Sequence, residues 1–299
     1  WQKTILLGFS LPTWRLSTFV AQTCTIQGTP GKWPVREGGQ VIKAVLFDLD
    51  NTLIDINLAA FMLRYMAGQA RILSRVLRVA PPFASSAITA AYLAICSPRR
   101  TDQLLNEDLF HRVVERRLRL PFDPEPLAEA TQYYDCTYIE KFRGGLVQAG
   151  PRPGSHEAIE AARGLGLTVA LATNPVVALA VDRVRMVWGE LDPDEFADVS
   201  HIGNSRRTKP CAPYFEGFTA RLGYAPSECL MVGNDAGRDF PRPNIGMPVA
   251  YVGHGRPKKA VFRGSLDELA TRLPELVATL DAQLRNPQTE AHHLDQGPA

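Results

Sequence analysis

The sequence lacks the features that mark several common classes of protein. No apolar stretch approaches the roughly 18 residues that a bilayer-spanning helix needs, so no membrane span is predicted. The five cysteines are scattered, odd in number and without a Cys-x-x-Cys pair, which argues against a zinc site and a disulfide framework. We therefore expect reduced thiols in a cytoplasmic protein.

An excess of charge of one sign is also missing. The 33 basic residues nearly balance the 31 acidic ones, which gives a formal net charge of +2 and no whole-chain attraction for nucleic acid. Internal repeats are absent as well. The sequence therefore favours a small molecule as partner, without nucleic acid or membrane, and it leaves the oligomeric state open.

The two ends of the chain have little of the pattern of a folded domain. Residues 1–40 begin with Trp1, contain no methionine and show no clear apolar periodicity. We expect them to be a non-native or disordered extension, with the native protein beginning near Val41; a peptide from residues 1–36 detected in the natural protein by mass spectrometry would contradict this. The polar tail, residues 286–299, is expected to be disordered.

Strand and helix patterns alternate along most of the remaining chain. The apolar run from Val41 to Phe47 is rich in β-branched residues and predicts a central parallel strand. Further strands are predicted at 167–172, 228–232 and 249–252, and helices at 155–163, 176–188, 214–222 and 266–284. This alternation predicts an α/β fold, a Rossmann-like parallel sheet with helices on both faces.

One region breaks the alternation. Between residues 57 and 142 the apolar residues recur at helix spacing, and prolines divide the region into roughly four helices. An all-helical block directly after the first strand is predicted to be an inserted cap. The core is then formed by residues 41–56 and 143–285, and the cap by residues 57–142.

Two carboxylates, Asp48 and Asp50, stand two residues apart where the first strand runs out. Chemistry in open α/β sheets gathers at the carboxyl ends of the strands, and side chains two apart on a strand point the same way. Two carboxylates held this close repel each other unless a cation or a shared proton lies between them. A hard divalent ion with oxygen ligands, above all Mg²⁺, is the expected solution.

Three further polar segments fall near predicted strand ends or helix starts. Thr173-Asn174 follows the strand at 167–172, Lys209 precedes a helix, and Gly233-Asn234-Asp235 with Asp239 follows the strand at 228–232. Each segment alone is explained by a turn, a helix cap or a surface charge. Their joint occurrence in this order favours a single active site.

This ordered set resembles the haloacid dehalogenase (HAD) superfamily of phosphohydrolases, whose motifs read DxDx[TV], then Thr or Ser, then Lys, then an acidic pair after Gly. The resemblance covers roughly residues 41–284, and the helical block matches the cap that many members insert. It implies a Mg²⁺-dependent hydrolase that acts on a small phosphorylated metabolite through an aspartyl-phosphate.

The resemblance also implies roles for the residues. Asp48 would attack phosphorus as the nucleophile, and Asp50 would act as general acid and base. Thr173 and Lys209 would hold phosphate oxygens and offset developing charge. The residues implied in substrate binding are Asn51, Thr52 and Asn174.

The implied metal site uses the Asp48 carboxylate, the backbone carbonyl of Asp50 and Asp235. Many members carry an acidic residue directly after the glycine, where this chain has Asn234, so Asn234 is the rival ligand. Asp239 would orient Lys209 or a metal-bound water from behind the ligands.

Two functional alternatives stay open. Dehalogenating members lack the second aspartate, because a halide leaving group needs no proton, so Asp50 argues for phosphoester hydrolysis. A phosphonate-cleaving member would bring a cap lysine, and the predicted cap has essentially only Lys141, near its end. A phosphomutase, or a binding or regulatory protein with weak catalysis, remains the alternative.

Overall fold

The computed structural model describes residues 41–119 and 124–285. The expected N-terminal extension, residues 1–40, and the expected disordered tail, residues 286–299, lie outside the described residues. Within the described ranges, no helix combines the length and the apolar character that a bilayer span requires. Cys96, Cys211 and Cys229 are free thiols.

Five parallel strands form the central sheet. Their order is β4 (Thr168–Leu171), β1 (Ala44–Phe47), β5 (Cys229–Gly233), β6 (Val249–Tyr251) and β7 (Phe262–Arg263). The predicted parallel α/β sheet is therefore confirmed. Phe47 pairs with Leu171 on one side and Val232 on the other, so the carboxyl ends of three strands meet beside Asp48.

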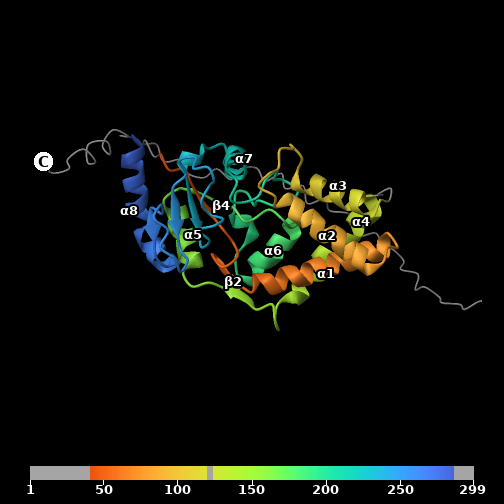
Figure 1. Cartoon of the computed structure of the whole chain (residues 1–299). Coiled ribbons are helices and arrows are strands. Elements are labelled where there is room, and N and C mark those ends of the chain that lie inside the picture. The colour runs from red at the N-terminus through yellow and green to blue at the C-terminus, as the bar shows by residue number, and fades with distance from the viewer. Residues whose placement is uncertain (1–40, 120–123, 286–299) are drawn as a thin grey trace, which may run out of the picture. The chain divides into compact units, whose positions relative to one another are not determined.

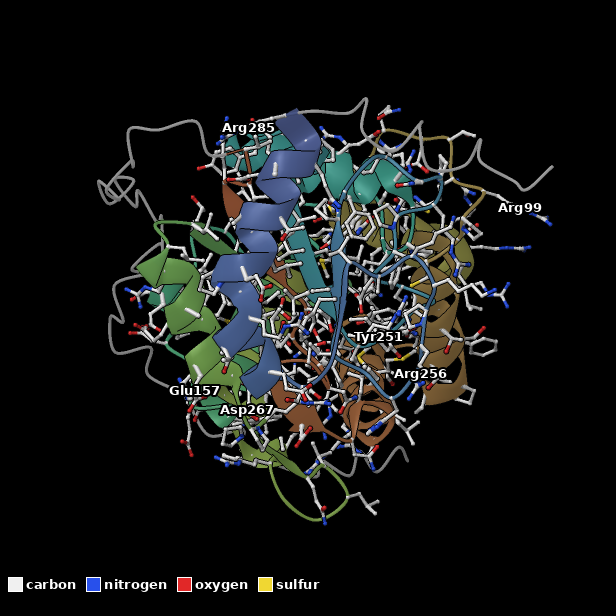
Figure 2. All side chains as sticks on the ribbon, turned by 90° about the vertical axis from the view of Figure 1, so that its left-hand side faces the viewer. Arg99, Glu157, Tyr251, Arg256, Asp267 and Arg285 are labelled. Carbon is white, nitrogen blue, oxygen red and sulfur yellow. The ribbon has the colours of Figure 1, made fainter. Side chains whose placement is uncertain are left out.

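The two faces of the sheet bury alternate residues of β1. Ala44 and Leu46 pack with aromatic residues of α7 (Ala212–Leu222), whereas Val45 and Phe47 belong to the core that includes α5 (Ser155–Gly164) and α8 (Leu266–Arg285). This alternation follows from the two-residue period of a strand. Figure 1 shows α5 and α8 beside the strands, and Figure 2 looks onto α8 with α5 next to it. Helices thus cover both faces, as predicted.

A helical block follows the first strand, and we use that name for α1 to α4 and the 3-10 turn η1. Its helices are α1 (Leu58–Val76), α2 (Pro81–Ile95), α3 (Asn106–Leu118) and α4 (Pro124–Thr137), and η1 spans Ile139–Phe142. Its interior is mainly apolar and aromatic, with Phe61, Tyr65 and Ile95 fully buried, and it also buries Asp135. Four α-helices agree with the sequence pattern; the division into core and cap domains stays a prediction.

A short antiparallel pair stands where the chain enters and leaves the helical block. It consists of β2 (Ile54–Ile56) and β3 (Ala149–Pro151). Two short 3-10 turns, η2 (Pro193–Glu195) and η3 (Pro226–Glu228), lie elsewhere in the chain. The helix α6 (Leu179–Trp188) contacts β2, β3 and α4. It begins three residues later than predicted, because residues 174–178 form a turn in which Val176 N donates to Asn174 O.

Candidate active site

The first strand ends in a tight turn that sets the site. Asp48 N still donates to Val232 O (2.9 Å), but the amides of residues 52, 53 and 54 all donate to Leu49 O. Asn51 has φ of +59°, in the left-handed region where asparagine is enriched among residues other than glycine. The turn therefore redirects the chain immediately after Asp48.

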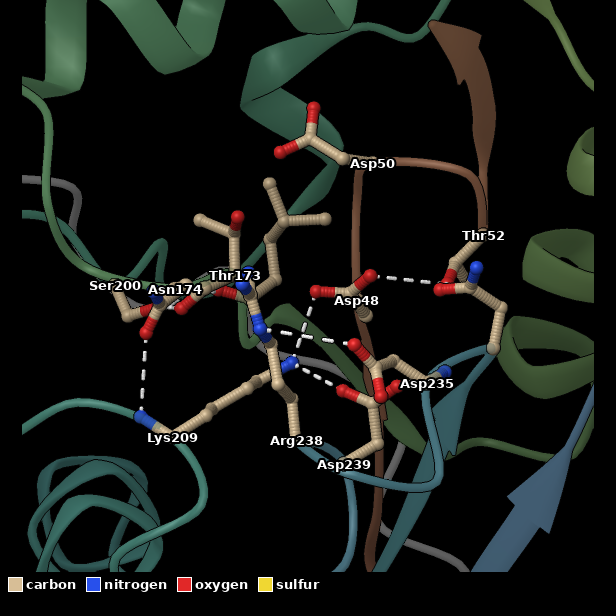
Figure 3. Close-up of polar contacts among 12 residues, drawn as sticks. Asp48, Asp50, Thr52, Thr173, Asn174, Ser200, Lys209, Asp235, Arg238 and Asp239 are labelled. Atoms are coloured by element: carbon tan, nitrogen blue, oxygen red, sulfur yellow. Dashed lines mark hydrogen bonds and ion pairs between the residues drawn. The ribbon is translucent and has the colours of Figure 1, made fainter. Parts of the chain in front are cut away.

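A buried lysine joins Asp48 to Asp239. Lys209 Nζ donates to Asp48 Oδ1 (2.9 Å) and to Asp239 Oδ1 (2.7 Å), and Asp239 Oδ2 accepts from Asp235 N (2.8 Å). The side chains of Lys209 and Asp239 are each 1% exposed. Figure 3 shows these contacts below Asp48. Three segments that are far apart in the sequence thus meet at one cation, as the sequence predicts.

The electrostatics of this cluster follow from burial and charge. Burial opposes the charged form of Lys209, but the carboxylates of Asp239 and Asp48 raise its pKa above the ordinary value. Burial also raises the pKa of Asp239 to about 6, although Lys209 acts in the opposite direction. The lysine therefore stays charged, and the site holds more carboxylate than one cation neutralises.

Asp50 points elsewhere. Its carboxylate accepts from Arg185 Nη1, and Arg185 Nη2 donates to Asp182. Figure 3 shows the Asp50 carboxylate turned away from Asp48. The prediction that the two carboxylates point the same way is wrong, because the strand ends at Phe47 and its two-residue alternation no longer applies beyond it. Each aspartate has its own protein cation instead of sharing one.

The cluster around Arg185 is as buried as the cluster around Lys209. Asp182 is 0% and Arg185 2% exposed, and the Arg185 guanidinium lies 5.3 Å from the centroid of the Phe61 ring. Burial raises the pKa of Asp182 to about 7, and burial also raises the pKa of Asp50. Sequence reasoning missed this pair. Its signal was the placement of Asp182 and Arg185, three residues apart, among the apolar positions of a helix.

Thr52 links the turn to the loop after β5. Its Oγ1 lies 3.0 Å from Asp48 Oδ2 and 3.1 Å from Asn234 Oδ1. A hydroxyl has one proton, so it satisfies only one of these two acceptor oxygens at a time. The arrangement therefore leaves acceptor capacity beside Asp48.

The other predicted substrate-binding residues surround Asp48 and Lys209. Asn51 and Asn174 line the same pocket, and Asn174 Oδ1 accepts from Lys209 N (3.2 Å). Thr173, predicted as a catalytic residue, is buried two residues after β4, and its carbonyl accepts from Ser200 Oγ (2.6 Å). Asn51 and Asn174 line the pocket and Thr173 does not; the roles of all three stay predictions.

The two rival metal ligands differ in position. The Asn234 amide oxygen meets the Thr52 hydroxyl beside Asp48. The Asp235 carboxylate accepts from Gly237 N (2.7 Å) and lies 3.6 Å from Arg238 Nε, and its side chain is 49% exposed. This geometry favours Asn234 over Asp235, the ligand expected from the sequence.

The Asp48 carboxylate, the Thr52 hydroxyl and the Asn234 amide oxygen lie next to one another. Within residues 41–119 and 124–285, no three His, Cys, Asp or Glu side chains form a metal-binding group by themselves. The amide oxygen of Asn234 and the backbone carbonyl of Asp50 are oxygen donors of the kind that Mg²⁺ accepts together with a carboxylate. The donor chemistry around Asp48 therefore fits a hard divalent cation.

A pocket of about 540 Å³ opens over Asp48. This volume lies within the range of small-molecule sites. One side is formed by residues of the loops at the strand ends, and the other by α1, α2 and the residue after α2. The lining from the loops and α6 is Asp48, Asp50, Asn51, Asn174, Val176, Arg185, Lys209, Asn234, Asp235, Arg238 and Asp239, and the lining from the helical block is Leu58, Ala59, Met62, Met66, Tyr92 and Cys96.

Comparison with known proteins finds one family. The profile described as haloacid dehalogenase-like hydrolase matches residues 42–241, more than half of the chain. No curated protein matches.

Solved structures similar to this chain include two phosphatases and a dehalogenase. A HAD phosphatase from Thermococcus onnurineus shares 22% identity at a TM-score of 0.45, covering 77% of this chain and 97% of its own. The L-2-haloacid dehalogenase from Xanthobacter autotrophicus shares 17% identity at a TM-score of 0.44, and the match covers 78% of this chain and 99% of the dehalogenase. A predicted phosphoglycolate phosphatase from Haemophilus somnus shares 15% identity at a TM-score of 0.44, and the match covers 79% of this chain and 100% of that protein.

Proposed function

The chain belongs to the haloacid dehalogenase-like hydrolases, and on that premise we propose that it is a Mg²⁺-dependent hydrolase of small phosphate monoesters. The observation that carries the proposal is the buried Lys209 ammonium between Asp48 and Asp239, with Asp48 open to the pocket. A carboxylate fixed beside a cation at a strand end is suited to attack a phosphorus atom whose oxygens that cation holds.

The proposed reaction has two displacements. In the first, an Asp48 oxygen forms a bond to phosphorus, the ester P–O bond breaks, and the leaving alcohol takes a proton from Asp50. In the second, a water oxygen forms a bond to phosphorus, the bond between phosphorus and the Asp48 oxygen breaks, and Asp50 takes a proton of that water, which releases inorganic phosphate and restores the Asp48 carboxylate. Lys209 and Thr173 hold the phosphate oxygens, and Asn51, Thr52 and Asn174 position the ester.

The second aspartate is what favours phosphate over halide chemistry. A halide leaves as an anion without a proton, whereas an alkoxide needs one. Asp50 lines the pocket, and burial raises its pKa, which favours the protonated acid that the first displacement requires. Its bond to Arg185 holds the carboxyl group until a substrate enters.

The charges of the site support a divalent cation. Four carboxylates, Asp48, Asp239, Asp50 and Asp182, meet two cations, Lys209 and Arg185. Four negative and two positive charges leave a formal surplus of two negative charges, which protons or a divalent ion must offset.

We propose the Asp48 carboxylate, the Asp50 backbone carbonyl and the Asn234 amide oxygen as the metal ligands, with Asp235 as the alternative. When bound, Mg²⁺ would offset charge on the phosphate oxygens as a Lewis acid.

Phosphate release from p-nitrophenyl phosphate and from a panel of phosphorylated metabolites tests the proposal. The full chain is assayed with Mg²⁺ or with a chelator, alongside Asp48→Asn and the matched control Asp194→Asn, an aspartate whose side chain is 86% exposed. We expect Mg²⁺-dependent turnover in the parent and the control and none in Asp48→Asn. Turnover that survives in Asp48→Asn would refute the nucleophile, and transfer to a sugar hydroxyl without phosphate release would identify a mutase.

A further inference from the structure

The wall of the pocket that is formed by the helical block carries no charged side chain. Its residues from the helical block are apolar or neutral, and Leu58, Met62 and Met66 recur at four-residue spacing along α1. Residues at this spacing share one face of a helix. α1 therefore presents a continuous apolar stripe to the part of the pocket where a leaving group would lie.

The arginines of α1, and Arg78 two residues after its end, lie outside this stripe. Arg64, Arg71, Arg75 and Arg78 are all exposed, and none of them lines the pocket. Arg64 lies over the ring of Phe142, with its guanidinium carbon 4.3 Å from the ring centroid. The helix is thus basic toward solvent and apolar toward the pocket. A basic pocket face would recognise a second anionic group on a substrate, and α1 does not provide one.

The hydroxyl group of Tyr92, the one aromatic residue that lines this wall, already makes a hydrogen bond within the protein. Tyr92 is 8% exposed, and its hydroxyl donates to Gln69 Oε1 (2.9 Å). Gln69 in turn donates through Nε2 to Tyr65 OH (3.0 Å). The wall therefore offers a leaving group the ring of Tyr92 and little unused hydrogen-bonding capacity.

Every cation that lines the pocket is paired with a carboxylate of this chain. Lys209 is paired with Asp48, and Arg185 with Asp50. Arg238 is the least constrained: its side chain is 54% exposed and lies 3.6 Å from Asp235. A second anion on the substrate would thus meet neutral side chains on one side and an excess of carboxylates on the other.

From this distribution we propose that the substrate is a phosphate monoester of an uncharged, largely apolar alcohol, without a second anionic group. The inference rests on the proposed phosphohydrolase function and adds the class of leaving group. Met62 and Met66 suit this class, because methionine adapts to irregular apolar shapes. Burying a leaving group against this wall favours longer and more apolar alcohols up to the size of the pocket.

A series of alkyl phosphates tests the proposal. We expect kcat/KM of the full chain with Mg²⁺ to rise about fourfold per methylene from ethyl through butyl to hexyl phosphate, which corresponds to about 0.8 kcal/mol per methylene. At equal chain length, a terminal carboxylate or ammonium group should lower kcat/KM at least about tenfold, since its charge loses hydration against the wall. A flat series, or a preference for either charged tail, would overturn the proposal.

A matched pair of variants locates the effect in the wall. Met66→Lys places a cation on the apolar stripe. Leu63→Lys places the same charge elsewhere on α1, because Leu63 is 73% exposed and does not line the pocket. We expect Met66→Lys to shift the ratio of kcat/KM for the carboxylate-tailed ester over the alkyl ester at least about tenfold toward the carboxylate. Leu63→Lys should keep the parent ratio, and an equal shift in both variants would refute the assignment to this wall.

Failure of the function and failure of the inference are distinguishable. If esters are hydrolysed without the chain-length trend, the hydrolase stands and the apolar class is refuted. If no ester is hydrolysed, binding of hexylphosphonate and of its carboxylate-tailed counterpart, measured by calorimetry with Mg²⁺, decides the inference separately. Tighter binding of hexylphosphonate supports the apolar wall, and equal or weaker binding overturns it.

Discussion

Replacing Arg185 with methionine removes the cation that holds two carboxylates in the interior. Arg185 donates to Asp50 and Asp182, whose side chains are 12% and 0% exposed. Methionine keeps much of the apolar volume and none of the charge. Breaking a buried ion pair by removing one partner lowers the free energy of unfolding by about 3–5 kcal/mol, because the remaining charge is left uncompensated.

The loss should depend on pH, and Asp182 gives the direction. Its pKa in the folded protein is about 7, against an ordinary value of 3.8. A carboxyl with a raised pKa in the folded state contributes stability below its unfolded pKa, and this contribution is lost as the pH rises through the folded value. Without Arg185 the pKa of Asp182 rises further. The free energy of unfolding of the variant therefore continues to fall as the pH rises above 7, whereas the decrease that Asp182 causes in the parent is then complete. The difference between the two proteins is therefore larger at pH 8.5 than at pH 6.

Urea denaturation at both pH values measures this difference. The control is Arg183→Met, the same change two residues earlier on α6, where the arginine side chain is 30% exposed and its partner Asp194 is 86% exposed. An exposed pair contributes about 0–1 kcal/mol. Adding Asp182→Asn to Arg185→Met should restore part of the lost stability. Equal losses at positions 183 and 185, or a loss that does not grow between pH 6 and pH 8.5, would refute the reasoning.

Three further predictions concern the site. Asn234→Asp should tighten Mg²⁺ binding in calorimetry, because a ligand gains negative charge, whereas Asp235→Asn should change it little; the reverse order would make Asp235 the ligand. Asn51→Ala should lower the free energy of unfolding by about 1–2 kcal/mol more than Asn51→Gly in thermal denaturation, since φ is +59°; equal losses would contradict this. Lys209→Met should lower kcat about 100- to 1,000-fold, while Lys43→Met, whose side chain is 45% exposed, should keep the parent rate, and a similar loss in both would argue against a specific role for Lys209.

The sheet and the Lys209 cluster were predictable because one rule connects them. Parallel strands place their carboxyl ends at one edge, so residues that follow β1 and β5 meet wherever the strands pair. Asp48 and Asp239 follow these strands, and Lys209 lies just before a helix that covers the same sheet. Period-two patterns and motif order carry this information without knowledge of the side-chain positions.

The remaining features depend on orientations that no periodicity fixes. The partner of Asp50 depends on how α6 docks, because Arg185 comes from a helix on which Asp182 and Arg185 are buried while Arg183 is partly exposed. Asn234 and Asp235 are neighbours, and only the path of the loop decides which oxygen meets Thr52. The apolar face of α1 was visible in the sequence, but not that Phe61 packs into the block while Met62 lines the pocket.

The identity of the two cations accounts for the different parts that we propose for the two aspartates. Lysine presents a compact charge on a flexible stem, whereas arginine holds carboxylates in a rigid planar fork. In the proposed reaction, Lys209 would therefore transfer hydrogen bonds from Asp48 to incoming phosphate oxygens and free a carboxylate oxygen for attack. Arg185 fixes Asp50 from one side and shares its fork with Asp182, which suits a carboxyl group that must stay at a constant place. Exchanging the two cation types should thus impair both sites, although the formal charge of each would be kept.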